Sequence, residues 1–323
     1  MRSLLLLALL SLFPLMSKAA CPSPAATASF GTATTFVVNT TPSTTSTSIA
    51  VNCGAGSNLT LLGTDTIVFR LTGATVVSAS RGIMKRSGDT GTDNIPVRLC
   101  VDSACATELQ VNGASYTFSS ASLLTLLVGS QLNFNLPVYL RTVPGQTIAA
   151  GTYNVTLNLS VTYNICTSIN LLGLCLGGQT GTNVVPIAVS IIVSNDCTTI
   201  TAPNVSFGSA PLVSSFSSVS QTISVVCSKG STYTVGLSNG SYAAGSVRNM
   251  ASGANRLSYE IYKGTSSDRW GPTGTERWSS TTSTSVSTDG LTRGYSYTAR
   301  ILANQNTPPA GNYSDSVVVD LAF

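Results

Sequence analysis

Hydrophobic and polar residues alternate along much of this chain. Tyr153–Tyr163 has a hydrophobic residue at every second position and a polar residue at each position between them. Three further segments carry apolar residues at every second position: Ile95–Val101, Leu132–Val138 and Val185–Val193. A period of two residues is typical of β-strands that bury one face. Glycine, proline, asparagine and serine turns separate these segments, and no segment after residue 20 has helical spacing, so an all-β fold is predicted.

The sequence pattern occurs twice. Each copy opens with a cysteine, a Ser-Phe-Gly triplet and a second cysteine: Cys21, Ser29–Gly31 and Cys53 in the first copy, and Cys197, Ser206–Gly208 and Cys227 in the second. Short strands at regular spacing predict a β-sandwich in each copy. We therefore expect two tandem domains, an N-terminal domain of residues 21–194 and a C-terminal domain of residues 195–323.

The two copies differ in their last strands. Each has a late strand that begins Ala-Gly-x-Tyr, at Ala150 in the first copy and at Ala310 in the second, where Asp315 interrupts the hydrophobic face. The first copy continues into one more strand, Val184–Val193, whereas the sequence of the second ends at Phe323. We expect the second sandwich to lack its final strand, and an open sheet edge of this kind can accept a strand from another chain.

The first 20 residues have the features of a secretory signal peptide. Arg2 precedes the apolar run Leu4–Leu15, and Ser17 and Ala19 are small residues suited to a cleavage site. The mature chain would begin at Ala20 or Cys21. Lys18 argues against a lipoprotein with lipid on Cys21, because an aliphatic residue is expected there.

Composition narrows the function classes. Only 9% of the residues are charged, and the net charge of +4 is not gathered into a basic stripe, so nucleic-acid binding is not expected. The sequence has no histidine, which excludes Ser/His/Asp and Cys/His catalytic triads and weakens any zinc-site interpretation. The few carboxylates form no marked pair. We expect neither an enzyme nor a bound cofactor or metal.

The eight cysteines in an exported chain indicate disulfides. Cys21 with Cys53 and Cys197 with Cys227 occupy matching positions in the two copies, which suggests one bridge in each. The remaining cysteines are close in sequence, and they suggest two small closed loops, Cys100 with Cys105 and Cys166 with Cys175.

Leucine-rich segments distinguish the first copy from the second. They occupy three loop positions where the second copy is shorter, is polar or has no residues. Single leucine segments usually pack in a core, but the alternating strands already supply one, so we expect an exposed apolar patch. Its members are Leu59, Leu61 and Leu62; Leu123, Leu124, Leu126, Leu127 and Val128; and Ile169, Leu171, Leu172, Leu174 and Leu176.

The paired-cysteine opening with Ser-Phe-Gly, and the Ala-Gly-x-Tyr strand, resemble the spore coat protein U domain family, which includes subunits of archaic, Csu-type chaperone–usher pili. The resemblance implies immunoglobulin-like sandwiches, of which the incomplete one is filled first by a strand of a periplasmic chaperone. After export through an outer-membrane usher, a strand of the adjacent pilin subunit would replace it. The residues expected to line the acceptor groove are Phe207, Ile223, Val225, Val317, Val319, Leu321 and Phe323.

The resemblance also implies a position in the fibre. A chain that starts near Cys21 has no donor extension, so it is expected to accept a strand without giving one, as a two-domain tip adhesin does. Its leucine segments would bind abiotic or host surfaces at the cell-surface pilus tip and promote biofilm formation. Two alternatives remain at this point: a structural spore-coat-like or capping subunit without adhesive activity, and a secreted carbohydrate-binding sandwich. The latter is disfavoured because Trp270 and Trp278 lie away from the leucine segments.

Overall fold

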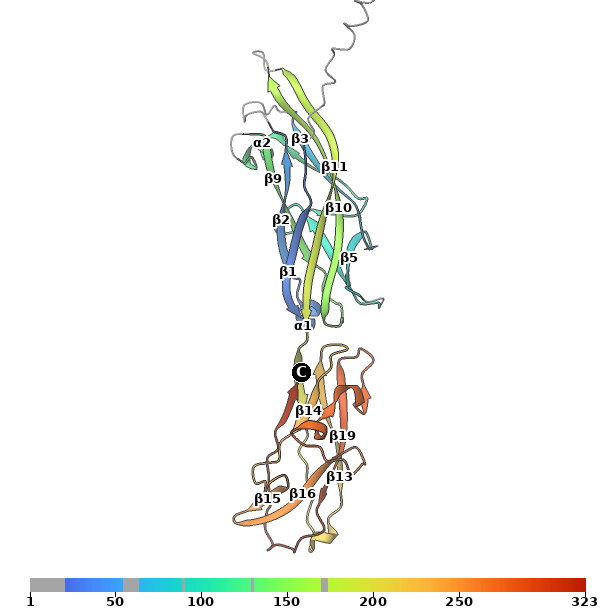
Figure 1. The fold of residues 1–323 in the computed structure, drawn as a ribbon, viewed down its shortest axis with the longest axis vertical. Coiled ribbons are helices and arrows are strands. Elements are labelled where there is room, and N and C mark those ends of the chain that lie inside the picture. Colours follow the sequence, from blue (N-terminus) through green and yellow to red (C-terminus); the bar gives the residue numbers. More distant parts are fainter. Residues whose placement is uncertain (1–20, 55–63, 89–90, 129–130, 170–173) are drawn as a thin grey trace, which may run out of the picture. The chain divides into compact units, whose positions relative to one another are not determined.

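A computed structural model describes residues 21–54, 64–88, 91–128, 131–169 and 174–323 (Figure 1). The chain folds as two compact units, which change over between Ile191 and Ile192. Two short segments of the first repeat, Thr32–Thr41 and Gly145–Gly151, group with the second unit. The predicted signal peptide, residues 1–20, lies outside the described residues.

Strands of the first repeat join edge to edge in the order β1-β11-β10-β5-β6-β9-β2. Strand β10 pairs with β5 at Tyr153 and Asn154 and with β3 over Leu157–Asn164, so hydrogen bonding continues from one layer of the sandwich to the other. The elements are β1 Ala26–Thr34, α1 Thr35–Thr40, β2 Thr44–Asn52, β3 Thr66–Ala74, β4 Val77–Ser78, β5 Arg81–Arg86, β6 Asn94–Cys100, β7 Glu108–Leu109, β8 Tyr116–Ser119, α2 Ser120–Thr125, β9 Asn133–Thr142, β10 Gly151–Ile169 and β11 Cys175–Ser194.

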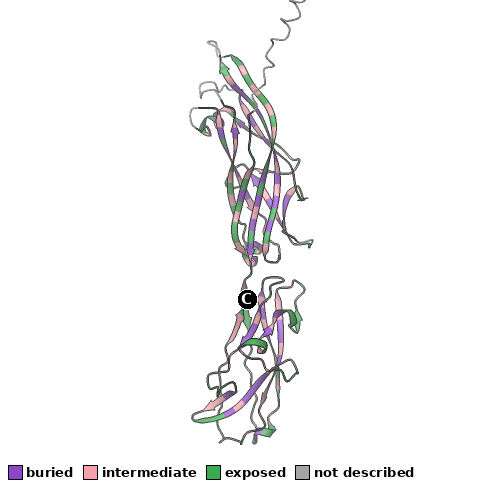
Figure 2. Ribbon diagram, viewed as in Figure 1, coloured by how far each residue is buried: buried purple, intermediate pink, exposed green. Residues whose placement is uncertain are grey.

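The alternating hydrophobic residues of the first repeat form its core. Every second residue of β10 from Tyr153 to Tyr163 is buried, and so are Val185, Ile187, Val189, Ile191 and Val193 of β11. The intervening side chains of both strands are exposed or half-buried, which Figure 2 shows as colour changes along the long ribbons. Strand β11 lies between β1 and β10, so it closes the sheet and adds its apolar face to the core.

Two short α-helices correct the expectation that no helix follows residue 20. Helix α1 begins after Thr34, whose hydroxyl accepts a hydrogen bond from the Val37 N–H, and it buries Val38. Helix α2 buries Leu123. Six residues are too few to establish a helical period in a sequence, and such helices depend on tertiary packing. No helix of the described part of the chain is long and apolar enough to cross a membrane.

The second unit consists of two facing sheets. One has the order β12-β13-β19-β16-β15, with β18 also on β19, and the other has the order β17-β14-β20. The elements are β12 Cys197–Thr201, η2 Val213–Ser215, β13 Val219–Cys227, β14 Thr234–Leu237, β15 Arg248–Ser252, β16 Asn255–Lys263, η3 Gly274–Glu276, β17 Trp278–Ser279, η4 Ser280–Thr282, β18 Ser285–Val286, β19 Thr292–Ile301 and β20 Val319–Ala322.

Aromatic side chains fill the centre of the second unit. Trp270 is fully buried, its ring meets that of Trp278 edge-on with centroids 5.0 Å apart, and its Nε1–H donates to the Val235 carbonyl at 2.9 Å. Tyr295 packs beside both indoles. These contacts satisfy the polar atom of a large buried ring, as aromatic cores require. The predicted fold class is confirmed: the chain has two tandem immunoglobulin-like sandwiches, and among the described residues of the second no strand takes the place that β11 has in the first.

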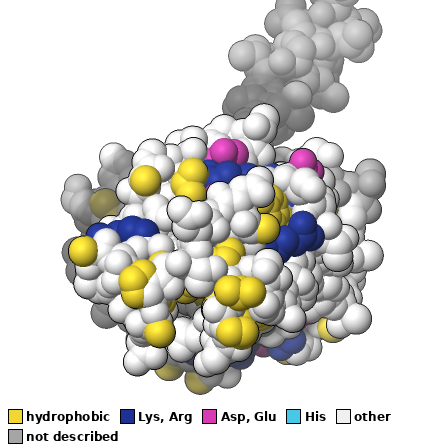
Figure 3. Space-filling view, turned by 90° about the horizontal axis from the view of Figure 1, so that it is seen from below, with side chains coloured by type: hydrophobic (Ala, Val, Ile, Leu, Met, Phe, Trp, Pro, Cys, Tyr) yellow, Lys and Arg dark blue, Asp and Glu magenta, His cyan; other side chains and the backbone are white. Residues whose placement is uncertain are grey.

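Four disulfides join the cysteines of the described residues, and they are the pairs that the repeat and the spacing suggested. They link Cys21 to Cys53, Cys100 to Cys105, Cys166 to Cys175 and Cys197 to Cys227. Figure 3 shows one face, covered mainly by neutral polar groups and backbone, with scattered hydrophobic side chains and a few groups of charged ones.

Candidate functional sites: an acceptor groove and leucine-rich loops

Strand β20 of the second unit has an open edge. It pairs with β14, with Val319 opposite Leu237 and Leu321 opposite Val235. Among the described residues no strand pairs with its other edge, because β20 ends the sheet order. In the first unit the matching strand, β10, has β11 on that side.

Residues 202–210, which face this edge, also form no strand. In the first unit the Ser-Phe-Gly triplet, residues 29–31, belongs to β1, which pairs with β11. In the second unit β12 ends at Thr201, and residues 202–210, including Ser206–Gly208, form no strand. The strand predicted over Tyr313–Phe323 likewise forms only over β20. An extended segment without a neighbour has no backbone ladder to hold it, which accounts for both short strands.

A groove lies between these two segments. Its first part is a cavity of about 430 Å³, lined by residues 202–205 and 313–317 and by core side chains such as Ile223. A second hollow of about 510 Å³ continues it along residues 205–213 and 307–313. The two share Val205, Phe207, Met250 and Tyr313. We call them together the acceptor groove.

The structure separates the seven predicted groove residues into two sets. Phe207, Ile223, Val317 and Val319 line the first cavity. Val225 is fully buried in the core and does not line it. Leu321 packs against the core on β20, and Phe323 is 70% exposed with its ring 6.1 Å from that of Tyr233.

Asp315, the exception in the hydrophobic pattern, lines the groove and is held from several sides. Its Oδ1 accepts the backbone N–H groups of Ser241 and Ser316, each at 2.8 Å, and its Oδ2 accepts the Tyr259 hydroxyl at 2.7 Å. Burial raises the pKa of the Tyr259 hydroxyl, and the bond to Asp315 raises it further. Gly240, at φ +84°, admits the carboxylate, because a Cβ there would collide with it.

Hydrogen bonds to neighbouring loops also hold residues 314–318, which precede β20. The Val318 N–H donates to Ser238 Oγ and the Ser238 N–H to the Val318 carbonyl, both at 2.9 Å. Ser314 and Ala251 exchange two backbone hydrogen bonds. These contacts hold one wall of the groove in position although no strand occupies the groove.

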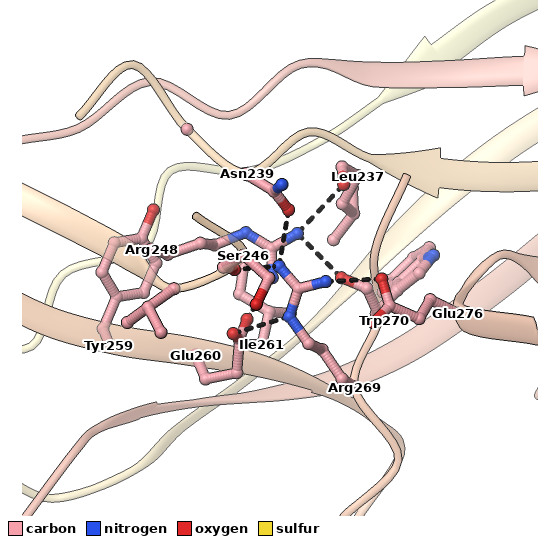
Figure 4. A network of polar contacts seen from close by, with 12 residues as sticks. Leu237, Asn239, Ser246, Arg248, Tyr259, Glu260, Ile261, Arg269, Trp270 and Glu276 are labelled. Atoms are coloured by element: carbon pink, nitrogen blue, oxygen red, sulfur yellow. Dashed lines mark hydrogen bonds and ion pairs between the residues drawn. The ribbon is translucent and has the colours of Figure 1, made fainter. Parts of the chain in front are cut away.

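A buried ionic network supports the turn that carries Ser238 (Figure 4). The Arg248 guanidinium is fully buried, donates to the carbonyls of Leu237, Ser238 and Trp270, and pairs with Glu260. Burial lowers its pKa, while the Glu260 carboxylate opposes that shift. Arg269 donates to the other oxygen of Glu260 at 2.7 Å. Sequence reasoning missed this network, since isolated charged residues in a β-protein carry no spacing signal.

Several residues of the predicted leucine patch have exposed side chains. Leu124 and Val128 are each 49% exposed, Leu174 is 62% and Leu176 is 71% exposed. Leu126 and Leu127 are half-buried. The prediction that Leu123 belongs to an exposed patch is wrong. Leu123 is fully buried, because α2 turns it inward while Leu124 faces solvent. Ile169 ends β10, and its side chain lies outside the described set, as do residues Leu59, Leu61, Leu62, Leu171 and Leu172.

Asp65 forms hydrogen bonds to both the β10–β11 hairpin and the start of α2, which carry leucine-rich segments. It is 2% exposed and follows residues 55–63 in sequence. Its Oδ1 accepts the Cys166 N–H at 2.7 Å, and its carbonyl accepts the Ser120 hydroxyl at 3.0 Å. Cys166 closes the β10–β11 hairpin, and Ser120 begins α2, at the same end of the first unit (Figure 1). Sequence reasoning gave Asp65 no role, because its partners are far apart along the chain.

One solved structure has a similar fold, and two others match with TM-scores below 0.5. A chain of the CsuC-CsuE chaperone-tip adhesion subunit pre-assembly complex, from archaic chaperone-usher Csu pili of Acinetobacter baumannii, is 24% identical with a TM-score of 0.57, covering 94% of this chain and 100% of that one. A mutant of the CFA/I adhesin CfaE of enterotoxigenic E. coli is 11% identical (TM-score 0.38; 94% and 93% covered). The CupB6 tip adhesin of Pseudomonas aeruginosa is 12% identical (TM-score 0.35; 87% and 84% covered).

Sequence comparison identifies the family. No curated protein matches the chain. The model of the Spore Coat Protein U domain matches it twice, over residues 7–160 and 183–320. The chain is therefore a member of the Spore Coat Protein U domain family, with two copies of the domain in tandem.

Proposed function

We propose that this chain is the tip adhesin of an archaic chaperone–usher pilus. In this proposal the second unit attaches to the fibre by accepting a strand in its groove, and the first unit binds surfaces through its leucine-rich loops. The observation that carries the proposal is the groove beside the open edge of β20, at the place that β11 occupies in the first unit. The role is one of binding and assembly, not of catalysis.

Strand β11 indicates what a filling strand contributes. It buries five aliphatic side chains at alternate positions. Burial of a valine or isoleucine side chain is worth about 1.5–3 kcal/mol, so such a strand contributes on the order of 10 kcal/mol before ordering costs. The proposed occupants are first a periplasmic chaperone and, after passage through an outer-membrane usher, the adjacent pilin subunit. Backbone pairing and alternate side-chain pockets are the general means of this kind of recognition.

The exposed apolar loops support the adhesive half of the proposal. Leu174 and Leu176 present large apolar side chains to solvent beside the Cys166–Cys175 disulfide, and Leu124 does so on α2. Apolar patches of this kind favour association with other apolar surfaces. They offer few directional polar groups, which suits abiotic or host surfaces of varied chemistry and a role in biofilm formation.

A fused strand tests the attachment half. Residues 182–194 are appended to the full chain after Phe323 through a flexible linker. We expect the second unit to gain several kcal/mol in free energy of unfolding and its Tm to rise by about 10 °C or more. The matched control appends the same strand with Ile187 and Ile191 changed to Asp, which removes the apolar contacts and keeps the length. Equal Tm values with the two appended strands would contradict the proposal.

A further inference from the structure

The acceptor groove has one polar position where the first unit is apolar. Alignment of the Ala-Gly-x-Tyr segments places Asp315 at the position of Val155. Val155 is buried in the first unit, where β11 covers it. A strand that fills the second unit therefore meets a carboxylate where β11 meets a valine.

The hydrogen-bonding capacity of this carboxylate is not used up. A carboxylate offers about four acceptor positions. Oδ1 has two N–H donors and Oδ2 has the Tyr259 hydroxyl, and within the described residues no further donor reaches it. One acceptor position on Oδ2 is left, and Asp315 lines a cavity whose other walls include Phe207, Ile223 and Val317.

Covering this position with an aliphatic side chain is unfavourable. It would remove water from a carboxylate oxygen without replacing the lost hydrogen bond, and burial of a polar group without a partner costs free energy. A single hydroxyl satisfies the remaining position. A lysine or arginine is a poorer match, because three hydrogen bonds already stabilise the carboxylate and a second charge would have to be desolvated among apolar walls.

We propose that the strand which completes the second unit carries a serine or threonine at its inward position facing Asp315, and aliphatic side chains at its other inward positions. This inference rests on the proposed function and adds the chemistry of the partner. Asp315 then acts as a specificity-determining residue that distinguishes the intended strand from one with a wholly aliphatic face.

The first unit indicates which position of the strand is concerned. Strands β10 and β11 are sheet neighbours joined by a short connection, so they run antiparallel. The hydroxyls of Thr162 and Thr182 lie 2.9 Å apart across the two strands. The alternation of burial is unbroken from there in both strands, and counting along it places Val189 beside Val155. In a filling strand with the sequence and register of β11, the threonine therefore belongs at the position of Val189.

Synthetic peptides test the inference with the full chain. The parent peptide has the sequence of residues 182–194, and each of five variants changes one inward residue to threonine. We expect threonine to weaken binding about 10-fold at the positions of Val185, Ile187, Ile191 and Val193. At the position of Val189 we expect binding to tighten about fivefold or more. In the chain with Asp315→Val the preference at that position should reverse.

The possible outcomes separate the two proposals. Binding of the parent peptide without a threonine preference at the Val189 position, or with the same preference in Asp315→Val, would overturn this inference and leave the proposed function standing. Failure of every peptide to bind would contradict the proposed function itself. If Asp315→Val does not fold, Tyr259→Phe decides: it frees a second acceptor position on Oδ2, so the threonine preference should persist or grow, and its loss would contradict the inference.

Discussion

The two units show what one sequence pattern becomes with and without a neighbouring strand. In the first unit the Ser-Phe-Gly triplet lies in β1, the Ala-Gly-x-Tyr strand β10 extends to Ile169, and β11 pairs with both. In the second unit the same triplet is outside any strand, and the segment after Tyr313 forms a strand only over Val319–Ala322. Local sequence therefore sets the hydrophobic face, whereas strand formation depends on a partner that supplies the ladder.

In the second unit, side-chain hydrogen bonds hold the segment that has no backbone ladder on its open side. Asp315 and Ser238 hold the segment before β20, and Arg248 holds the turn that carries Ser238. These contacts leave the groove open while keeping its wall in place. A preordered wall lowers the ordering cost when a strand binds.

The largest expected effect comes from disrupting β11, the strand of the first unit for which the described residues of the second unit have no counterpart. Val189→Asp places a carboxylate among buried aliphatics, and we expect it to lower the free energy of unfolding of the first unit by more than about 4 kcal/mol. Ala188→Asp, on the exposed face of the same strand, is the matched control and should change it by less than about 0.5 kcal/mol. Urea unfolding of the full chain measures both. Similar losses for the two variants would show that β11 is not a core strand.

Replacement of the buried Arg248 should have the second largest effect, a destabilisation of the second unit. Arg248→Met leaves three carbonyls without their donor and Glu260 with one partner fewer, so we expect a loss of about 3 kcal/mol. Arg256→Met removes an exposed guanidinium from β16 and serves as the control. Equal unfolding midpoints for both variants would mean that the network does not support the groove wall.

A smaller effect is expected at the junction of the leucine-rich loops. Asp65→Ala removes the acceptor of the Cys166 N–H, and we expect a loss of about 1–3 kcal/mol together with faster hydrogen exchange of that amide. Asp65→Asn retains an oxygen acceptor and should exchange more slowly than Asp65→Ala. Unchanged exchange in Asp65→Ala would show that Asp65 does not position the hairpin.

The smallest stability effect should accompany the largest loss of adhesion. Leu174→Ser with Leu176→Ser changes exposed side chains, so the free energy of unfolding should move by no more than about 0.5 kcal/mol. Adsorption of the protein to a polystyrene surface should fall severalfold. Val184→Ser, which changes an exposed aliphatic residue of β11 outside the predicted patch, is the control. Equal adsorption by these two variants would remove the adhesive role of the hairpin.

Particular residues show how far the sequence could predict this molecule. The alternation in Tyr153–Tyr163 and Val185–Val193 was enough to assign both strands and their buried faces, because a period of two has one structural meaning. Leu123 and Leu124 could not be told apart, since a helix of six residues decides which of them is buried. The roles of Asp65 and Arg248 depend on partners far away in the sequence or on backbone carbonyls, which no residue pattern records.

Amide hydrogen exchange of the chain carrying the appended strand tests the central claim most directly. We predict that the amides of residues 204–208 and 317–321, on the two sides of the groove, become strongly protected when residues 182–194 are fused after Phe323. The fused strand bearing Asp at the positions of Ile187 and Ile191 should leave them exchanging as in the unmodified chain. Fast exchange of both segments in the presence of the unaltered strand would contradict the account.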